Sequence, residues 1–379
     1  MTDQSPLPTP DPPSAVPPAP VGDDRPRQPR LRLLLLGVAL VLAVGAVVAV
    51  RARNDDEPTA PVAGSLELAA PLGDLDRPDA PRVLLSLAPA EPGDNAAAVR
   101  ITTNDGTPIP GALPEGVRLA VASLDDPAAE REIETRPDRD GAATADLPLD
   151  AAGWWRLRIF PGQGGELDDG ANFYLLLPDP NLHGDGAVDT PSSDAEAEAV
   201  YERGAAATAA LHRLRYRQTM ADGAGHVALI EHAVNDGSDG QPPTFFYRVQ
   251  GGSEGYVVGD RGWTRRGGVW EVRTVSPVIP PSAWGEEYEG ATGFRLGGVE
   301  TVDGEPCRIV TFVVPERTEP RHQVAAWYAW WVGEESGQVR RETMVSRAHY
   351  MVNESWDFDA AISIAPPPEA LAASPPAER

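Results

Sequence analysis

The sequence predicts a mainly β protein with a single N-terminal transmembrane helix, a β-sandwich, and then a long antiparallel sheet preceded by one helix. Three observations support this prediction. An apolar run occupies Leu33–Val50. Short alternating segments follow one another between Arg82 and Leu177. Beyond Arg215 the hydrophobic pattern keeps a period of two residues.

The apolar run Leu33–Val50 sets the predicted location. Its 18 residues nearly span, as a helix, a hydrocarbon core of roughly 30 Å. Arginines precede the run, and Arg51 and Arg53 are followed at once by acidic residues, so the positive-inside rule places the N-terminus in the cytoplasm. We therefore predict residues 31–50 as an uncleaved anchor in the cell membrane, with a cleaved signal peptide as the alternative. In either case the remaining chain is extracytoplasmic.

Composition sets the other boundaries. Residues 1–30 contain ten prolines and are predicted to be a disordered cytoplasmic tail. Residues 51–80 are predicted as a linker, 180–193 as a hinge rich in Gly, Asp and Ser, and 366–379 as a disordered tail. Two folded units remain, at 81–179 and 194–365.

Charge and cysteine content exclude several functions. The formal net charge of −25 argues against a nucleic-acid partner, because phosphate binding requires clustered basic residues. The single cysteine, Cys307, excludes an intramolecular disulfide and a thiolate zinc cluster, and we expect it to be a buried, inert thiol. The sequence has no GxSxG, HExxH, Walker or dinucleotide-binding motif. We therefore expect neither an enzyme nor a cofactor.

The first unit reads as a series of short strands. The predicted segments are Val83–Leu87, Ala98–Thr102, Val117–Ser123, Arg131–Glu134, Ala142–Leu147, Trp154–Phe160 and Asn172–Leu177. About seven strands at this spacing predict a β-sandwich.

Two segments of this unit carry a family resemblance. DGTPIPGA at Asp105–Ala112 and AAGWWRLRIF at Ala151–Phe160 resemble the YtkA-like immunoglobulin-type domains found beside bacterial copper-transport membrane proteins. The resemblance implies an extracytoplasmic Ig-like sandwich in a metal-handling neighbourhood. Between Arg82 and Asn181, however, there is no His, Met or Cys, so the metal part of the resemblance does not carry over.

The second unit begins with a helix. Ser193 opens the sequence S-D-A-E, which predicts a capping box with Glu196. One stripe of small and branched residues is expected to pack on a sheet. Its members are Val200, Gly204, Ala207, Leu211 and Leu214.

A long antiparallel meander is predicted to follow this helix. Its expected strands are Tyr216–Met220, His226–Val234, Thr244–Gln250, Gly255–Gly259, Val269–Thr274, Phe294–Val299, Cys307–Val314, Val324–Val332, Val339–Val352 and Ala361–Ile364. Asp303-Gly304 suits a type I′ turn between two of them.

This second unit resembles the LolA-like superfamily, which includes mycobacterial LppX-type lipoproteins. The segments that carry the resemblance are AEAVYERGAAATAALHRLRYRQTM, VVGDRGWTRRGGVWEV, LGGVETVDGEPCRIVTF and WYAWWVGEESGQVRRETMVSRAHYM. It implies a strongly curved, half-open antiparallel sheet, barrel-like, with a covering helix. Family members typically hold acyl chains or other lipids between sheet and helices and carry no catalytic residues. The chain lacks their lipid-modified cysteine, so the resemblance fits a tethered receptor or sensor better than a shuttle.

Tryptophans mark the expected site. VAAWYAWWV at Val324–Val332 is apolar at both strand phases, so both of its faces should be covered by protein or ligand. We predict that an apolar ligand is lined by four tryptophans of the second unit, and the alternative is that they fill an ordinary core. They are Trp263, Trp270, Trp327 and Trp331.

Two further functions stay open. His349 and Met351 fall on the same side of one strand, and imidazole with thioether is a copper-type ligand pair. The alternatives to a lipid or apolar-ligand binding protein are therefore an accessory protein for copper handling at the cell surface and a module for protein contacts, including a membrane-protein partner.

Overall fold

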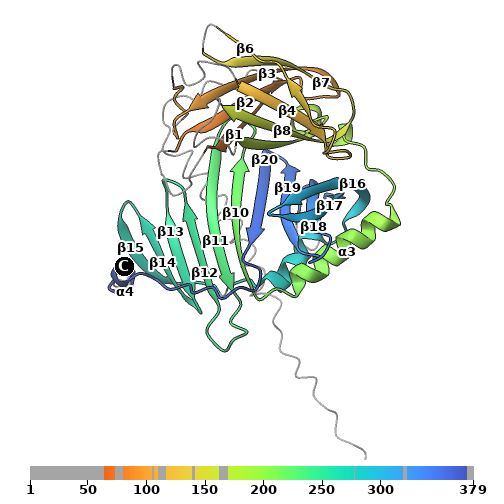
Figure 1. The fold of residues 1–379 in the computed structure, drawn as a ribbon. Coiled ribbons are helices and arrows are strands. Elements are labelled where there is room, and N and C mark those ends of the chain that lie inside the picture. Colours follow the sequence, from red (N-terminus) through yellow and green to blue (C-terminus); the bar gives the residue numbers. More distant parts are fainter. Residues whose placement is uncertain are drawn as a thin grey trace, which may run out of the picture.

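The computed structural model describes residues 64–72, 80–104, 106–109, 117–138, 141–161, 170–276, 278–318 and 322–373. The predicted anchor Leu33–Val50, the tail before it and residues 374–379 lie outside this part of the chain. Among the residues described, no helix is long and apolar enough to cross a membrane. The fold is mainly β, with two small sheets stacked on one end of a large one (Figure 1).

Nine strands form the first unit, which we call the sandwich. They are β1 (Leu66–Pro71), β2 (Arg82–Ala88), β3 (Gly93–Thr102), β4 (Val117–Ser123), β5 (Arg131–Ile133), β6 (Arg136–Pro137), β7 (Ala143–Leu149), β8 (Gly153–Pro161) and β9 (Ala171–Leu177). They pair in the orders β1-β2-β3-β7-β6 and β5-β4-β8-β9. Leu85, Leu119 and Leu157 are fully buried members of one core shared by both sheets. All seven strands predicted here are present.

Strand β1 lies within residues 51–80, where we predicted a linker. It pairs antiparallel with β2, from Leu66 opposite Leu87 to Pro71 opposite Arg82. The pattern missed it because four of its six residues are buried, three of them consecutively, which leaves no alternation to detect. Its Glu67 N–H also donates to Gly223 O of the second unit at 2.9 Å.

The connection between the units is short and structured. Residues 180–193, predicted as a hinge, contain α2 (Pro180–His183) and the 3-10 helix η2 (Asp185–Ala187). The helix α3 (Ala195–Ala209) follows.

The predicted start of α3 is wrong by one residue. Its N-cap is Asp194, whose carboxylate accepts from Glu196 N at 2.8 Å. Ser193 accepts instead from Gly293 N at 3.1 Å, because the chain there is fastened to the sheet rather than to the helix.

The predicted stripe on α3 is correct at its start. Val200 and Gly204 are buried, whereas Leu211 and Leu214 lie beyond the helix and are buried in a different cluster.

Eleven strands form the large sheet. They are β10 (Arg213–Ala221), β11 (Val227–Asn235), β12 (Thr244–Val249), β13 (Glu254–Val258), β14 (Arg261–Arg266), β15 (Val269–Thr274), β16 (Thr292–Val302), β17 (Glu305–Val314), β18 (Ala326–Gly333), β19 (Val339–Ser346) and β20 (His349–Trp356). The chain runs outward from β10 to β15, crosses through the 3-10 helix η3 (Pro281–Tyr288), and returns from the opposite edge, β16, to β20 beside β10. Strands β15 and β16 are the two edges, so the sheet is not closed. Strands β16–β18 lie across the direction of β10–β15 (Figure 1).

The hairpin between β16 and β17 forms as predicted. Val302 pairs with Glu305, and Asp303 and Gly304 have φ of 48° and 80°, as a type I′ turn requires.

Three other expectations for this unit need correction. Residues 339–352 form two strands, β19 and β20, because the chain turns at Ala348, whose φ is 49°. Residues 361–364 form no strand. The predicted disordered tail contains the short helix α4 (Pro368–Leu371), whose Ala370 is fully buried near Trp263.

Candidate functional site

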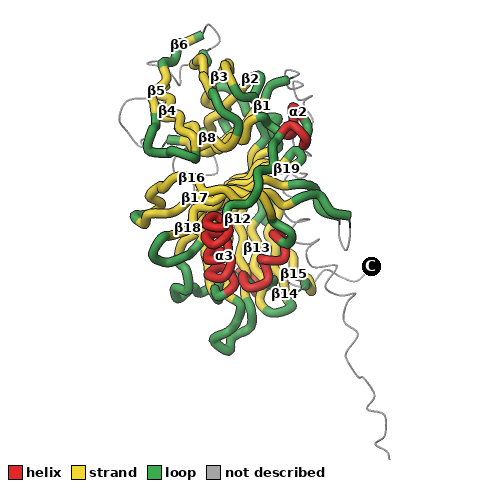
Figure 2. Tube along the Cα trace, turned by 90° about the vertical axis from the view of Figure 1, so that its right-hand side faces the viewer, coloured by secondary structure: helices red, strands yellow, loops and turns green. Residues whose placement is uncertain are grey.

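The two faces of the large sheet are covered differently. Along β18, Trp327 and Trp331 belong to the core shared with the sandwich, while Tyr328 and Trp330 belong to the cluster beneath α3. We call the first side the outer face and the second the inner face. Every residue of β18 is buried, which confirms that both of its faces are covered. Figure 2 shows α3 lying across the inner face.

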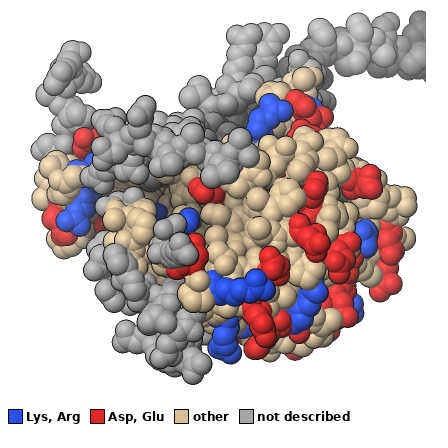
Figure 3. Space-filling view, turned by 90° about the horizontal axis from the view of Figure 1, so that it is seen from above, with Lys and Arg blue, Asp and Glu red and all other residues tan. Residues whose placement is uncertain are grey.

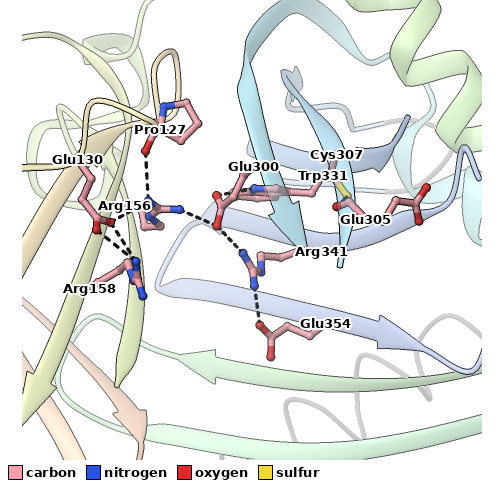
Figure 4. A network of polar contacts seen from close by, with 10 residues as sticks. All are labelled: Pro127, Glu130, Arg156, Arg158, Glu300, Glu305, Cys307, Trp331, Arg341 and Glu354. Atoms are coloured by element: carbon pink, nitrogen blue, oxygen red, sulfur yellow. Dashed lines mark hydrogen bonds and ion pairs between the residues drawn. The ribbon is translucent and has the colours of Figure 1, made fainter. Parts of the chain in front are cut away.

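A chain of charged side chains joins the sandwich to the outer face (Figure 4). Arg156 on β8 pairs with Glu130 of the sandwich at 2.8 Å and with Glu300 of β16 at 2.6 Å. Glu300 also pairs with Arg341 of β19 at 3.2 Å, and Arg341 reaches Glu354 of β20 at 3.2 Å. The Arg156 and Arg341 side chains are only 7% and 12% exposed. Each buried guanidinium therefore has carboxylate partners, as desolvated charges require.

A second polar contact fastens the end of the sandwich to β20. The Tyr350 hydroxyl donates to Asp179 at 2.9 Å and accepts from Asn181 Nδ2 at 2.9 Å. Burial raises the pKa of Asp179, and the hydrogen bond from Tyr350 opposes that shift. Arg82 of β2 also donates to Val227 O at 3.1 Å. Protein side chains thus cover this part of the outer face.

On the inner face, aromatic rings fill the space beneath α3. Gly204 allows the close approach of the helix, since a Cβ there would lie 3.1 Å from Val332 Cγ2. Tyr201 of α3 stacks on Trp330 with 5.0 Å between ring centroids. The other rings of this cluster are Phe294, Phe312, Tyr288 and Tyr328.

A pocket of about 710 Å³ opens between α3 and η3, beside this aromatic cluster. We call it the mouth pocket. The rings of Tyr201, Tyr288 and Phe294 line it, together with Ala291. Charged and small residues complete its lining, namely Glu198, Glu202, Gly285, Glu286, Glu289, Gly290 and Arg317. Arg317 pairs with Glu289 at 3.0 Å. The site thus combines an aromatic wall with a charged rim.

Strand register aligns two rows of side chains across the middle of the inner face. In the first row, Glu342 of β19 is opposite Asn353 of β20, which is opposite Gln218 of β10. We call it the polar row. In the adjacent row, Met344, Met351 and Met220 occupy the same three strands. These are all the methionines of the chain apart from Met1.

Glu342 is the most deeply buried member of the polar row. Its residue is 8% exposed, and one carboxylate oxygen accepts from the Tyr288 hydroxyl at 2.8 Å. Burial raises the pKa of Glu342 to about 7. None of the ion pairs among the described residues includes it, in contrast with the carboxylates of the outer face.

His232 on β11 lies on the same face, one strand beyond Gln218. It stacks on Tyr216 at 4.3 Å between ring centroids, and the residue is 9% exposed. Burial lowers the pKa of His232 to about 3, so the ring is neutral. Both of its ring nitrogens lack a hydrogen-bond partner among the described residues, as does Asn353 Oδ1.

The four predicted tryptophans do not line one cavity. Trp331 is fully buried on the outer face, where it meets Tyr174 edge-on at 5.0 Å and donates to Glu300 at 3.0 Å, and Trp327 belongs to the same core. Trp263 and Trp270 pack near α4. They are separated because Trp327 and Trp331 lie on β18, whereas Trp263 and Trp270 lie on β14 and β15 towards the opposite edge of the sheet.

His349 and Met351, the predicted copper-type pair, have further neighbours that the sequence did not indicate. Met351 lies between Met344 and Met220, and its sulfur accepts from Gln218 Nε2 at 3.1 Å. His349 is opposite Ser346, and burial lowers its pKa. Within the described ranges, no three His, Cys, Asp or Glu residues are placed to hold a metal ion. Cys307 is fully buried, and burial raises its pKa to about 11.

The residues of the mouth pocket and the polar row escaped the sequence analysis. Tyr201 directly follows Val200, the first residue of the predicted apolar stripe of α3. Its place next to that stripe was a usable signal that its ring is half-buried against the sheet. Gln218 is more than a hundred positions from Glu342 and Asn353, so only the strand register reveals that the three are neighbours.

No protein-family model matches the sequence, and no curated protein matches it. Among solved structures, the lipoprotein LppX of Mycobacterium tuberculosis is similar at 14% identity and a TM-score of 0.35, covering 46% of this chain and 100% of LppX. LprF of Mycobacterium bovis is similar at 15% identity and a TM-score of 0.36, covering 46% and 99%. A LolA superfamily protein from Nitrosomonas europaea covers 42% and 91% at 12% identity and a TM-score of 0.21. Less than half of the chain thus shares a likeness with the LppX, LprF and LolA-like lipoprotein fold.

Proposed function

We propose that this chain is a membrane-anchored, extracytoplasmic protein that binds an apolar-tailed ligand at the mouth pocket and the adjoining inner face. The observation that carries the proposal is the pocket itself. Its volume of about 710 Å³ lies within the roughly 300–1,000 Å³ range of small-molecule sites. Tyr201, Tyr288 and Phe294 give it an aromatic wall, and Met344 packs against the same aromatic cluster with a side chain that adapts to irregular shapes.

The proposed binding is tested by photolabelling the full chain in phosphatidylcholine vesicles. The probe is a long-chain alkyl methyl ester that carries a diazirine, and labelled peptides are located by mass spectrometry. We expect labels in α3, η3 and the inner-face strands. In the variant Ala291→Trp the new indole occupies the pocket, so most of that labelling should disappear.

A matched variant controls for the added tryptophan. Ala128→Trp places the same side chain at an exposed position of the sandwich and should leave labelling unchanged. Equal labelling of both variants, with both folded by circular dichroism, would contradict the proposed site.

The anchoring part of the proposal rests on Leu33–Val50 and its flanking charges. We expect the full chain to stay in the membrane fraction after alkaline carbonate extraction, and a chain lacking residues 31–50 to be released. Cleavage of the native chain near residue 50 would favour the signal-peptide alternative instead.

The sandwich we propose to be immunoglobulin-like in topology. Its orders β2-β3-β7-β6 and β5-β4-β8-β9 correspond to strands A-B-E-D and C′-C-F-G of that fold. Its proposed role is to close the outer face of the large sheet. The relationship to YtkA-like domains stays a prediction.

A copper-handling role is the second candidate, and the methionine row favours it. Thioethers prefer Cu(I) among the first-row ions, and the row offers three of them on neighbouring strands. The test is titration of the folded chain with Cu(I) in competition with a colorimetric chelator. Tight binding that Met351→Leu removes would support this function, and the absence of competition would end it.

A further inference from the structure

The polar row has an apolar row on one side. Its own register continues through Ile230 and Val249 at one end and Trp330 at the other. The row on one side consists of methionines flanked by Tyr328 and Ala228. The row on the other side contains Ser355, Tyr216 and His232. Glu342, Asn353 and Gln218 therefore place hydrogen-bonding groups between an apolar row and a mixed one.

Several of these groups are buried without protein partners. Asn353 Oδ1 and both ring nitrogens of His232 lack a hydrogen bond among the described residues, and the residue His232 is 9% exposed. A buried polar atom left unpaired costs about 1–3 kcal/mol, and native proteins retain few such atoms. A ligand that supplies the missing partners would remove that cost.

The chemistry of the row selects the kind of partner. When it is ionised, the Glu342 carboxylate only accepts hydrogen bonds, as Asn353 Oδ1 does, so a partner shared by both groups above the pKa of Glu342 donates hydrogen bonds. An anionic head group is disfavoured, because Glu342 carries no paired cation in the described structure and the raised pKa of Glu342 has a contribution from neighbouring Glu287. Figure 3 views the molecule from above, the side on which the sandwich lies in Figure 1, and shows acidic and basic side chains scattered over that surface.

We propose that the inner face selects an amphiphile whose polar group donates hydrogen bonds, a hydroxyl or an ammonium group, with Glu342 and Asn353 as its acceptors. His232 offers one donor and one acceptor to the same polar group or its neighbour. This inference rests on the proposed binding of an apolar-tailed ligand and specifies the head group of that ligand.

Four probes with one alkyl chain and four head groups test this selection. Each competes against the photoreactive methyl ester on the full chain in phosphatidylcholine vesicles. The heads are a hydroxyl, a primary ammonium, a methyl ester that only accepts, and a carboxylate. We expect the hydroxyl or the ammonium probe to compete on the order of tenfold better than the ester and the carboxylate, as one hydrogen bond to a buried acceptor implies.

Variants of the row assign the preference to these residues. Glu342→Gln removes the charge, and Asn353→Leu removes the acceptor at similar size. Each should reduce the preference, measured within each variant as the ratio between competition by the hydroxyl or ammonium probe and competition by the ester. Met344→Leu changes only the apolar lining and should keep the preference.

The outcomes separate the inference from the proposed function. Three results would overturn the inference: equal competition by all four head groups, strongest competition by the carboxylate probe, or a preference that survives both variants. In each case, labelling of the inner face by the ester would still support the binding of an apolar ligand. Failure of the ester to label the inner face at all would overturn the proposed function itself. If the ammonium probe exceeds the hydroxyl probe and loses that advantage in Glu342→Gln, the ligand class is cationic; the reverse order identifies a hydroxyl lipid.

Discussion

The two faces of the large sheet carry buried carboxylates that differ in their partners. On the outer face Glu300 lies between Arg156 and Arg341 and also accepts from Trp331. On the inner face Glu342 accepts from the Tyr288 hydroxyl, and no ion pair among the described residues includes it. Both carboxylates come from neighbouring regions of one sheet, so burial alone does not explain the difference.

The comparison separates a structural surface from a binding surface. An interface that holds two units together is stable only if its desolvated charges are paired within the protein. A surface that receives a ligand keeps donors and acceptors for that ligand, at some cost to the stability of the free protein. We therefore assign the outer face to assembly of the two units and the inner face to recognition.

The largest expected effect comes from breaking the outer face. Glu300→Ala removes the carboxylate that accepts from Arg156, Arg341 and Trp331, although Arg156 keeps Glu130 and Arg341 keeps Glu354. Because hydrogen bonds to charged groups contribute about 1.5–3 kcal/mol each, we expect the free energy of unfolding to fall by about 3–5 kcal/mol. Urea denaturation followed by tryptophan fluorescence measures it. Glu334→Ala is the control, because the Glu334–Arg308 pair is 45% and 36% exposed and should contribute about 0–1 kcal/mol. Similar losses in the two variants would contradict the structural role of the network.

The second effect concerns the pH dependence of the inner face. Burial raises the pKa of Glu342 from 4.5 to about 7, so between these values the folded chain binds more protons at this group than the unfolded chain. Its contribution to the free energy of unfolding therefore falls as the pH rises through this window, by up to about 3 kcal/mol. Glu342→Gln cannot ionise and lacks this dependence.

Urea denaturation at pH 5 and pH 8 measures that contribution. We expect the loss of stability from pH 5 to pH 8 to be smaller in Glu342→Gln than in the native chain by about 2–3 kcal/mol. Tyr288 and Glu287 face the same carboxylate and are unchanged in both proteins. An equal pH dependence in the two proteins would show that Glu342 ionises normally.

A smaller effect is expected at the second outer-face contact. Tyr350→Phe removes the hydroxyl that donates to the fully buried Asp179, and this should lower the free energy of unfolding by about 1–3 kcal/mol. Tyr256→Phe is the matched control, since Tyr256 donates to the partly buried Glu254 outside the interface. The comparison is refuted if the control loses as much stability.

The smallest effect is a difference between two histidines. Burial lowers the pKa of His232 to about 3, whereas a hydrogen bond that the ring of the exposed His212 donates to Asp236 raises the pKa of His212. In an NMR titration from pH 5 to pH 8 the His232 ring signals should stay at their neutral positions while those of His212 move. Movement of the His232 signals in this range would show that the inner face is wetter than its burial indicates.

Much of the fold could be predicted from the sequence, because local hydrophobic patterns and turn residues determine most of its strands and one of its hairpins. Period-two alternation predicted most strands of both units, though not β1, β6 or β14, and Asp303-Gly304 predicted a turn whose two positive φ values these residues tolerate. The apolar character of Val324–Val332 at both phases correctly indicated a strand covered on both faces. Strand β1 and helix α4 were missed because burial on all sides or a very short length leaves no periodicity.

The candidate site depended on the tertiary structure. No local pattern indicates that Glu342, Asn353 and Gln218 form one row, because the cross-strand register joins Gln218 to two residues more than a hundred positions away. The tryptophans that the sequence singled out lie on the outer face or near α4, since a composition bias does not say which packing partner each side of a strand will meet. The sequence determined the strands and their apolar faces; the tertiary structure decided what covers each face, because the sandwich and α3 bring residues from distant parts of the chain against them.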